Sequence, residues 1–153
     1  MNTKINIKQI STEDTYSIRQ KVLRPGKPID TCKFIGDDEK DTFHLGLYYK
    51  NELVGISTYM KNKNTVFKDL VQYQLRGMAV LPEFRGLNFG KQLLIEGKKI
   101  LKEKHLLWFN ARATAVKFYN NNNYHTIGDY FNIEGVGKHI IMYKAITKNK
   151  EDN

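Results

Sequence analysis

The segment Leu81–Leu94, LPEFRGLNFGKQLL, decides how the chain folds around it, because it joins a strand-like run to a helix-like run. The apolar residues LRGMAV (75–80) precede it, and an amphipathic, lysine-rich run follows it. A helix N-terminus exposes unpaired N–H groups and the positive end of the helix dipole. Glycines before it let the backbone close around an oxyanion, and Arg85 adds a permanent charge with a bidentate fork. The segment therefore predicts a phosphate-binding turn.

Two common nucleotide-binding motifs do not fit this turn. A Walker A loop has four residues between its glycines and then Lys-Ser/Thr, whereas Gly86 and Gly90 enclose three residues, and Lys91 is followed by Gln92. No hydroxyl is placed for magnesium, so the sequence argues against a nucleotide triphosphatase. The dinucleotide fingerprint GxGxxG is also absent from the chain.

Composition sets the broad class of the protein. The chain has 153 residues, 41% of them hydrophobic, as in an ordinary single globular domain. No apolar run approaches the roughly 20 residues of a membrane-spanning helix, and the first ten residues alternate like a strand rather than a signal peptide. With Cys32 as the single cysteine, no internal disulfide forms, and a cytoplasmic location is expected. The net charge of +9 favours an anionic partner without choosing among nucleic acid, acidic lipid and a phosphorylated small molecule.

Hydrophobic periodicity predicts alternating strands and helices. Strands are expected at 4–10, 43–50, 53–61, 73–82, 106–112, 124–131 and 139–146. Helices are expected from the N-cap Ser11 to about Leu23, from Leu87 to His105, and over 113–123. Asn51-Glu52 is the expected hairpin connection. This order, β-α-β-β-β-α-β-α-β-β, predicts an α/β (α+β) fold: one domain over 1–146 with a mixed sheet of about seven strands, helices on both faces, and a polar tail at 147–153.

The sequence, with its RGLNFG turn at 85–90, resembles the GNAT superfamily of acyl-CoA-dependent N-acetyltransferases. The family's hallmark is an Arg/Gln-x-x-Gly-x-Gly/Ala loop between a strand and a helix, and residues 85–90 read RGLNFG. MAVLPEF resembles the strand and proline that lead into this loop, and NAR…AVKFYNNNNYHTIG resembles a later family segment. VLRPGKPID, FHLGL and GVGKHIIMYK further resemble a small bacterial subgroup with no firmly assigned substrate. The similarity extends over nearly the whole chain, in order.

The resemblance implies acetyl-CoA as co-substrate. Its pyrophosphate would lie on the N–H groups of a loop made of Arg85, Gly86, Leu87, Asn88, Phe89, Gly90 and Lys91. Its pantetheine arm would pair like an extra strand with the backbone of Met78, Ala79 and Val80. Gly77 would ease a bulge that leaves N–H groups facing the thioester oxygen. Asn88 replaces the family's usual first glycine, and asparagine is the non-glycine residue that best tolerates a left-handed backbone.

Tyr119 matches the family's tyrosine beside the thiol of CoA, where a phenol can protonate the leaving thiolate. Its structural alternative is a partly buried core tyrosine. Asn110 matches a strand-end residue that contacts CoA or the cleft, and its alternative is a turn asparagine.

The general base is not readable from the sequence, which offers Glu39, His44, Glu83 and His139. His44 is expected to be half-exposed on its strand, and His139 to be structural. Arg24 and Arg76 are candidates for binding an acidic acceptor, or are surface or packing residues. With one cysteine and unpaired histidine spacing, no metal site is expected, and Cys32 is interpreted as a bystander.

The sequence thus predicts an N-acetyltransferase that moves an acetyl group from acetyl-CoA to a primary amine, by direct attack in a ternary complex. The acceptor, a small molecule or a peptide, is open. A CoA-binding protein without catalysis and a basic nucleic-acid-binding module are the alternatives; nucleic acid and membrane are not expected partners. Oligomeric state is not readable, although a homodimer is the commonest assembly.

Overall fold

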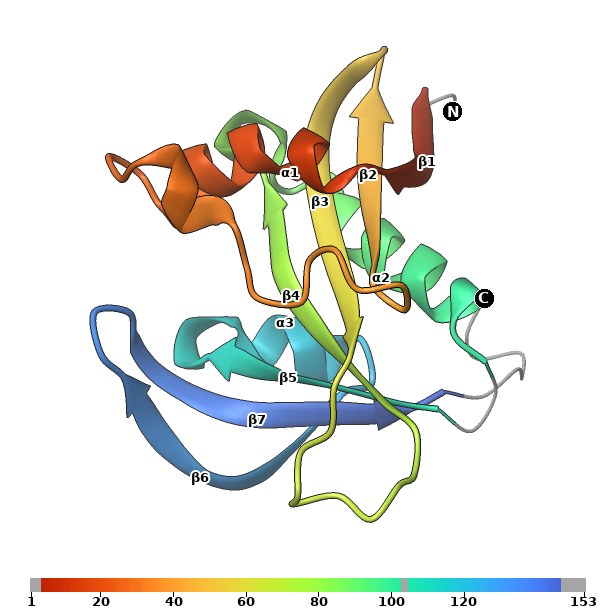
Figure 1. The fold of residues 1–153 in the computed structure, drawn as a ribbon, viewed down its shortest axis with the longest axis vertical. Helices are drawn as coiled ribbons and strands as arrows, with labels where there is room; N and C mark the ends of the chain where they lie inside the picture. Colours follow the sequence, from red (N-terminus) through yellow and green to blue (C-terminus); the bar gives the residue numbers. More distant parts are fainter. Residues whose placement is uncertain (1–3, 103–104, 147–153) are drawn as a thin grey trace.

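A seven-stranded sheet forms the centre of the molecule, with strand order β1-β2-β3-β4-β5-β7-β6 (Figure 1). The structure is a computed structural model that describes residues 4–102 and 105–146. Neighbouring strands are antiparallel, except that β4 and β5 run parallel. The strands are β1 (Ile5–Ile10), β2 (Phe43–Tyr49), β3 (Glu52–Lys61), β4 (Gln72–Val80), β5 (Leu106–Arg112), β6 (His125–Ile133) and β7 (Gly137–Ala145). The predicted mixed sheet is confirmed; the predicted tail, 147–153, lies outside the described residues, and the domain boundary stays a prediction.

Helices cover both faces of the sheet, as predicted. Figure 1 shows α1 in front of the strands and α2 behind β2 and β3. The helices and helical turns are α1 (Thr12–Ile18), η1 (Arg19–Leu23), η2 (Ile29–Cys32), η3 (Pro82–Phe84), α2 (Phe89–Ile100), η4 (Ala113–Ala115) and α3 (Val116–Asn121). Leu45, Leu47, Ile56, Leu93 and Met142 belong to the buried core between these layers.

The first helix follows its sequence signals and then changes pitch. The hydroxyl of Ser11 accepts a hydrogen bond from the N–H of Asp14, and Glu13 and Asp14 lie in the first turn, where the helix dipole favours negative charge. The α-helix then continues as a π-helical turn, η1. Such turns are rare and often occur at functional sites, and this one begins at the fully buried Arg19.

Several predicted boundaries are wrong by one or more residues, and two of them have a clear local cause. The β2–β3 hairpin turns at Lys50 and Asn51, one residue earlier than expected, and both have positive φ, of 50° and 70°. A two-residue turn of this kind matches the right-handed twist of the strands. Helix α2 covers Phe89–Ile100 and is shorter than the predicted 87–105, because Asn88 is left-handed at its start and Leu101 is extended and buried at its end.

The contact between β4 and β5 decides where a cleft opens. The two strands pair only at Gln72–Gln74 with Leu106–Trp108. Beyond these residues β4 continues along β3, and β5 continues along β7. The sheet therefore splits along the line between β4 and β5.

Candidate active site

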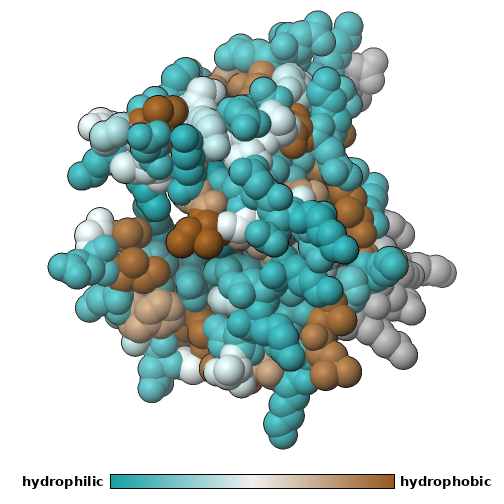
Figure 2. Space-filling view, viewed as in Figure 1, coloured by the Kyte–Doolittle hydropathy of each residue, from teal (hydrophilic) through white to brown (hydrophobic). Residues whose placement is uncertain are grey.

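A cleft of about 400 Å³ lies where β4 and β5 separate. The notch between the N-terminal segments and the β6–β7 hairpin is visible on the left of Figure 2, which has the orientation of Figure 1. The walls of the cleft combine residues from η1, the loop before β2, β4, β5, η4, α3, and the β6–β7 hairpin. The lining residues are Leu23, Arg24, Phe34, Gln74, Leu75, Arg76, Gly77, Met78, Phe109, Asn110, Ala111, Arg112, Ala115, Tyr119, Ile133, Val136 and His139.

Strand β4 carries a bulge on the cleft wall. Arg76 pairs with Thr58 and Ala79 pairs with Ile56, so Gly77 and Met78 both lie opposite the single residue Ser57. Gly77 has a φ of +59°, and a Cβ there would lie 3.0 Å from Cε2 of Phe34. Both the backbone conformation and the close ring favour glycine at this position. The bulge predicted at Gly77 is confirmed.

The turn after β4 has the predicted conformation. Gly86 has a φ of +83°, and Asn88 has a φ of 65° in the left-handed region, immediately before α2. The N–H of Gln92 is the first to bond within the helix, to the carbonyl of Asn88 at 3.0 Å. The first-turn N–H groups before it have no acceptor in the helix. Asn88 therefore adopts the backbone that the family's glycine would supply.

The turn abuts the bulged strand. A Cβ on Gly90 would lie 3.5 Å from Cζ of Phe118 and 3.7 Å from Cε of Met78, which are ordinary contact distances. Among the strand residues expected to contact pantetheine, Met78 lines the cleft, Ala79 is buried, and Val80 is half-buried. Ala79 and Val80 pair with β3, and none of the three residues pairs with β5, so the β5 side of this stretch is open.

Tyr119 lies in the cleft wall on α3. Its ring packs 4.4 Å from that of Phe109 and 6.1 Å from that of Tyr124, between centroids. Burial raises the pKa of its phenol to about 12, so the hydroxyl keeps its proton at neutral pH. At neutral pH the Tyr119 hydroxyl can therefore act as a proton donor and not as a general base. Asn110 is exposed in the same wall, on β5 opposite Ile141.

His139 is the base candidate that lines the cleft. The residue is 4% exposed, and its Nδ1 lies 2.7 Å from the carbonyl oxygen of Gly137. A carbonyl only accepts hydrogen bonds, so Nδ1 carries a proton, and in the neutral ring the lone pair is on Nε2. Whether His139 acts as a base or is structural stays a prediction.

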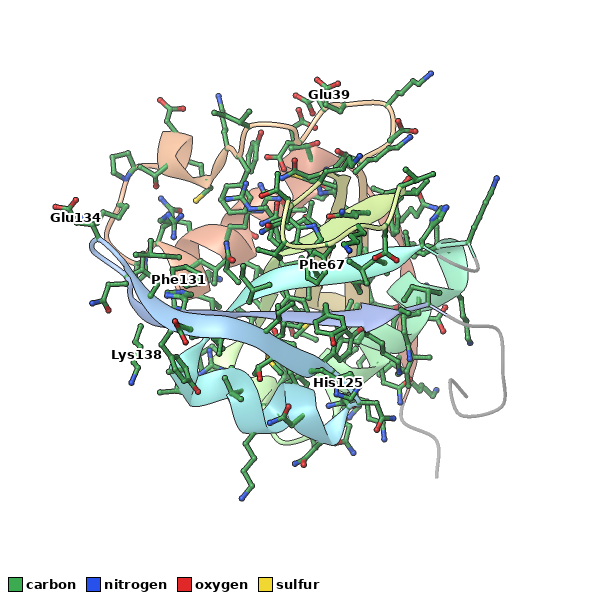
Figure 3. The ribbon with its side chains drawn as sticks, turned by 90° about the horizontal axis from the view of Figure 1, so that it is seen from below. Glu39, Phe67, His125, Phe131, Glu134 and Lys138 are labelled. Carbon is green, nitrogen blue, oxygen red and sulfur yellow. The ribbon has the colours of Figure 1, made fainter. Side chains whose placement is uncertain are left out.

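The other base candidates lie elsewhere. Glu39 is exposed at the outer edge of the molecule, as Figure 3 shows, and Glu83 is exposed on η3.

The half-exposed position expected for His44 is wrong: the residue is 4% exposed, because α1 and the loop before β2 cover this face of the strand. Its Nε2 lies 3.1 Å from the carbonyl oxygen of Asp37, and its Nδ1 lies 2.8 Å from Oγ1 of Thr58. Burial lowers its pKa below 6.5.

Comparison with known proteins identifies the family. The sequence model of the Acetyltransferase (GNAT) family matches residues 7–124. The chain belongs to this family. YitI of Bacillus subtilis (strain 168), named an uncharacterized N-acetyltransferase, is 34% identical over 148 residues, which cover 95% of this chain and 99% of YitI. The family membership and the N-acetyltransferase relationship predicted from the sequence are confirmed.

Solved structures show the same GNAT fold. An aminoglycoside 6'-N-acetyltransferase complexed with coenzyme A matches with a TM-score of 0.73 and 11% identity, covering 95% of this chain and 99% of that one. NAA60 of Arabidopsis thaliana, in complex with acetyl-CoA, matches with a TM-score of 0.70 and 12% identity, covering 94% and 99%. At these identities the likeness establishes the fold and leaves the acceptor open.

A buried ionic network that the sequence did not reveal supports the other side of this GNAT cleft. Nη1 and Nη2 of Arg19 donate to the two carboxylate oxygens of Asp37 at 2.7 and 3.0 Å. Burial alone would raise the pKa of Asp37, but hydrogen bonds from Arg19 and the Phe34 N–H, with the Arg19 charge, hold it below its usual value. An arginine on the same helical face as the buried Thr12 and Thr15 was the available signal.

Cys32 is buried, and its carbonyl accepts a hydrogen bond from Arg19 at 2.8 Å. Within residues 4–102 and 105–146, His, Cys, Asp and Glu form no group of three or more that could hold a metal ion. No helix in that part of the chain is long and apolar enough to span a membrane.

Proposed function

We propose that this GNAT protein transfers an acetyl group from acetyl-CoA to a primary amine, with both substrates bound together. The observation that carries the proposal is the separation of β4 from β5 beside the Gly77 bulge, with the Gly86–Lys91 turn packed against Met78. Acetyl-CoA supplies an activated acyl thioester. The chain supplies proximity, charge stabilisation and proton transfer.

The cofactor side of the cleft acts mainly through backbone. The N–H groups of the turn from Arg85 to Lys91 bind the pyrophosphate, and the Arg85 guanidinium adds charge. The open edge of Met78, Ala79 and Val80 binds the pantetheine amides as a neighbouring strand would. N–H groups at the Gly77 bulge face the thioester oxygen as negative charge develops on it. Asn110 contacts the same ligand from the β5 wall.

Two side chains move protons in this proposal. The amine nitrogen attacks the acetyl carbon, a C–N bond forms, and the C–S bond breaks. Nε2 of His139 accepts a proton from the amine, directly or through water. The phenol of Tyr119 donates its proton to the departing thiolate, for which the raised pKa of about 12 keeps it protonated. Proton uptake and release thus balance over one turnover.

Thermal melts with acetyl-CoA, CoA and ATP, followed by an amine panel, test this proposal. A ligand at about 100 times its Kd stabilises a protein by about 2.7 kcal/mol, or roughly 5–10 °C for a chain of this size. We expect this rise with both CoA forms and not with ATP, and release of free CoA thiol when a suitable amine is added. The absence of a rise with either CoA form would contradict the cofactor site. A rise without turnover on any amine would favour a CoA-binding protein without catalysis.

A further inference from the structure

Three arginines surround the ring of Phe34, on the wall of the cleft formed by η1, the loop before β2 and β4. This wall is here named the acceptor side. The guanidinium carbons of Arg19, Arg76 and Arg24 lie 3.9, 4.6 and 5.9 Å from the centroid of Phe34. These three residues are here named the arginine cluster. They come from η1, its C-cap and β4, so the fold brings together residues that are far apart in the sequence.

The charge of the cluster is only partly compensated. Asp37 is engaged by Arg19 through both carboxylate oxygens and also accepts the N–H of Phe34 at 2.8 Å. In the described part of the chain, Arg24 and Arg76 form no ion pair, although both line the cleft. Burial, with the nearby charges of Arg19 and Arg24, lowers the pKa of Arg76. A guanidinium stays charged even so, and such a group favours an oxyanion partner.

The arginine cluster lies next to the Gly77 bulge, where the thioester of acetyl-CoA is proposed to react. The ring of Phe34 lies 3.0 Å from where a Cβ on Gly77 would be, so the cluster borders the bulge. The Nε of Arg19 is also buried there without a hydrogen-bond acceptor among the described residues. The lining of the cleft includes Arg24, Arg76 and Arg112, and of the described residues no aspartate or glutamate contributes to it. A polycationic acceptor would meet repulsion in such a cleft.

We propose that the acceptor is a small primary amine that also carries an oxyanion group, a carboxylate or a phosphate, a few bonds from the nitrogen. The inference rests on the proposed acetyl transfer and specifies its substrate class. Arg24 and Arg76 bind the oxyanion through their guanidinium forks. The amine is then directed past Phe34 toward the Gly77 bulge.

Matched acceptors test the substrate class. Acetylation is measured with L-phenylalanine, L-phenylalaninamide and phenethylamine, with phosphoethanolamine against ethanolamine, and with spermidine as a polycation. We expect kcat/KM to be at least about tenfold higher for an anionic acceptor than for its matched neutral-substituent amine, as for a hydrogen bond to a charged group. The amino group of L-phenylalaninamide loses its proton more easily than that of L-phenylalanine. The intrinsic reactivity of the amine therefore favours the amide, so a preference for the acid would have to come from binding. Equal or better rates with the amide, phenethylamine or spermidine would overturn the proposal, and the two anionic probes distinguish carboxylate from phosphate.

Variants separate binding of the acceptor from binding of the cofactor. Arg76→Gln and Arg24→Gln should each raise KM for the anionic acceptor about tenfold to a hundredfold and leave KM for acetyl-CoA unchanged. Arg76→Lys should recover part of the loss, and Arg24→Glu should shift the preference toward the amide. Lys117→Gln removes one charge from the exposed surface of α3 and is the matched control, with no change expected. An unchanged acid-to-amide ratio in both glutamine variants would contradict the assignment.

A binding experiment covers the case in which no amine is turned over. L-Phenylalanine, its amide and phosphoethanolamine are titrated into the protein with and without saturating CoA, and melting is followed. We expect stabilisation by an anionic probe and not by the amide, with the effect lost in Arg76→Gln. Binding of CoA without any selective effect of the anionic probes would overturn the acceptor class and leave the proposed function intact. No binding of CoA would count against the proposed function, while the probes still report on the cluster.

Discussion

The two sides of the cleft are built from different parts of the chain. On the proposed cofactor side, the turn from Arg85 to Lys91 and the Met78–Val80 strand are short continuous stretches of chain, and we propose that their backbone groups bind acetyl-CoA. On the acceptor side, the arginine cluster brings side chains from η1 and β4 around Phe34, over the buried pair of Arg19 and Asp37. A side built from local backbone geometry leaves a continuous sequence motif, whereas a side built from distant side chains does not. The predictions below test whether the two sides can be altered separately.

The largest effect is expected from filling the turn. Gly90→Trp places a large side chain between Phe118 and Met78, where a Cβ alone would fit. Binding of acetyl-CoA should be lost, measured as disappearance of the ligand-induced rise in Tm. Gly90→Ala adds only a Cβ and is the control. It should keep more of the rise in Tm on adding acetyl-CoA than Gly90→Trp does. Normal binding by the tryptophan variant would refute the assignment of this turn.

Asp37→Asn should cost about 3–5 kcal/mol of unfolding free energy, because it leaves the charge of Arg19 buried without a carboxylate. For a chain of this size the loss corresponds to a fall in Tm of about 10 °C or more. Asp30→Asn removes a carboxylate from an exposed pair with Lys33 and is the control, with little change expected. Acetyl-CoA affinity, measured below the lowered Tm, should stay near that of the parent protein. Equal stability of the two variants would contradict the role given to Asp37.

Tyr119→Phe removes the proposed proton donor and keeps the ring that packs on Phe109. We expect kcat to fall about a hundredfold, at the low end of the range for a positioned acid, with little change in Kd for acetyl-CoA. Tyr130→Phe, on the exposed surface of β6, is the matched control. Unchanged turnover in Tyr119→Phe would remove the residue from the mechanism.

His139→Gln tests the proposed base. The glutamine cannot accept the amine proton, so kcat should fall about a hundredfold, at the low end of the range for a positioned base, with little change in Kd for acetyl-CoA. His125→Gln on the exposed surface of β6 is the control and should keep the parent rate. A fall in Tm or in acetyl-CoA affinity that accounts for the lost rate would point to a structural role for His139.

The smallest effect is expected in the pH dependence of the unfolding free energy, through His44, which lies beneath the loop of Asp37. Burial keeps the pKa of His44 below its ordinary 6.5 in the folded protein, so the unfolded chain binds more protons as the pH falls through this value. Stability should therefore decline below about pH 6.5 through His44. At lower pH, Asp37 adds a further loss, because its folded pKa is below 3.8. Urea melts from pH 7.5 to 4.5 should show a shallower decline for His44→Gln than for His125→Gln; identical slopes would contradict this account.

The comparison also explains what the sequence can predict. Periodicity predicted the order of strands and helices along the chain, and the resemblance to the GNAT family predicted the Gly77 bulge and the left-handed turn at Asn88, because each depends on local backbone conformation. The end of α2 and the position of the hairpin turn were wrong by a few residues, since tertiary packing decides such boundaries. The burial of His44 and the pairing of Arg19 with Asp37 depend on contacts between elements that periodicity does not bring together. Whether the cofactor residues and Tyr119 act as proposed stays a prediction.

Backbone hydrogen exchange with and without saturating CoA tests the central claim most directly, because the cofactor side is assigned to backbone groups. The account predicts slower exchange on CoA binding at the amides of residues 77–80 and 86–91, and little change in α1 and in the loop that carries Phe34. Protection that omits the 86–91 turn, or that falls mainly on the arginine-cluster side, would contradict it.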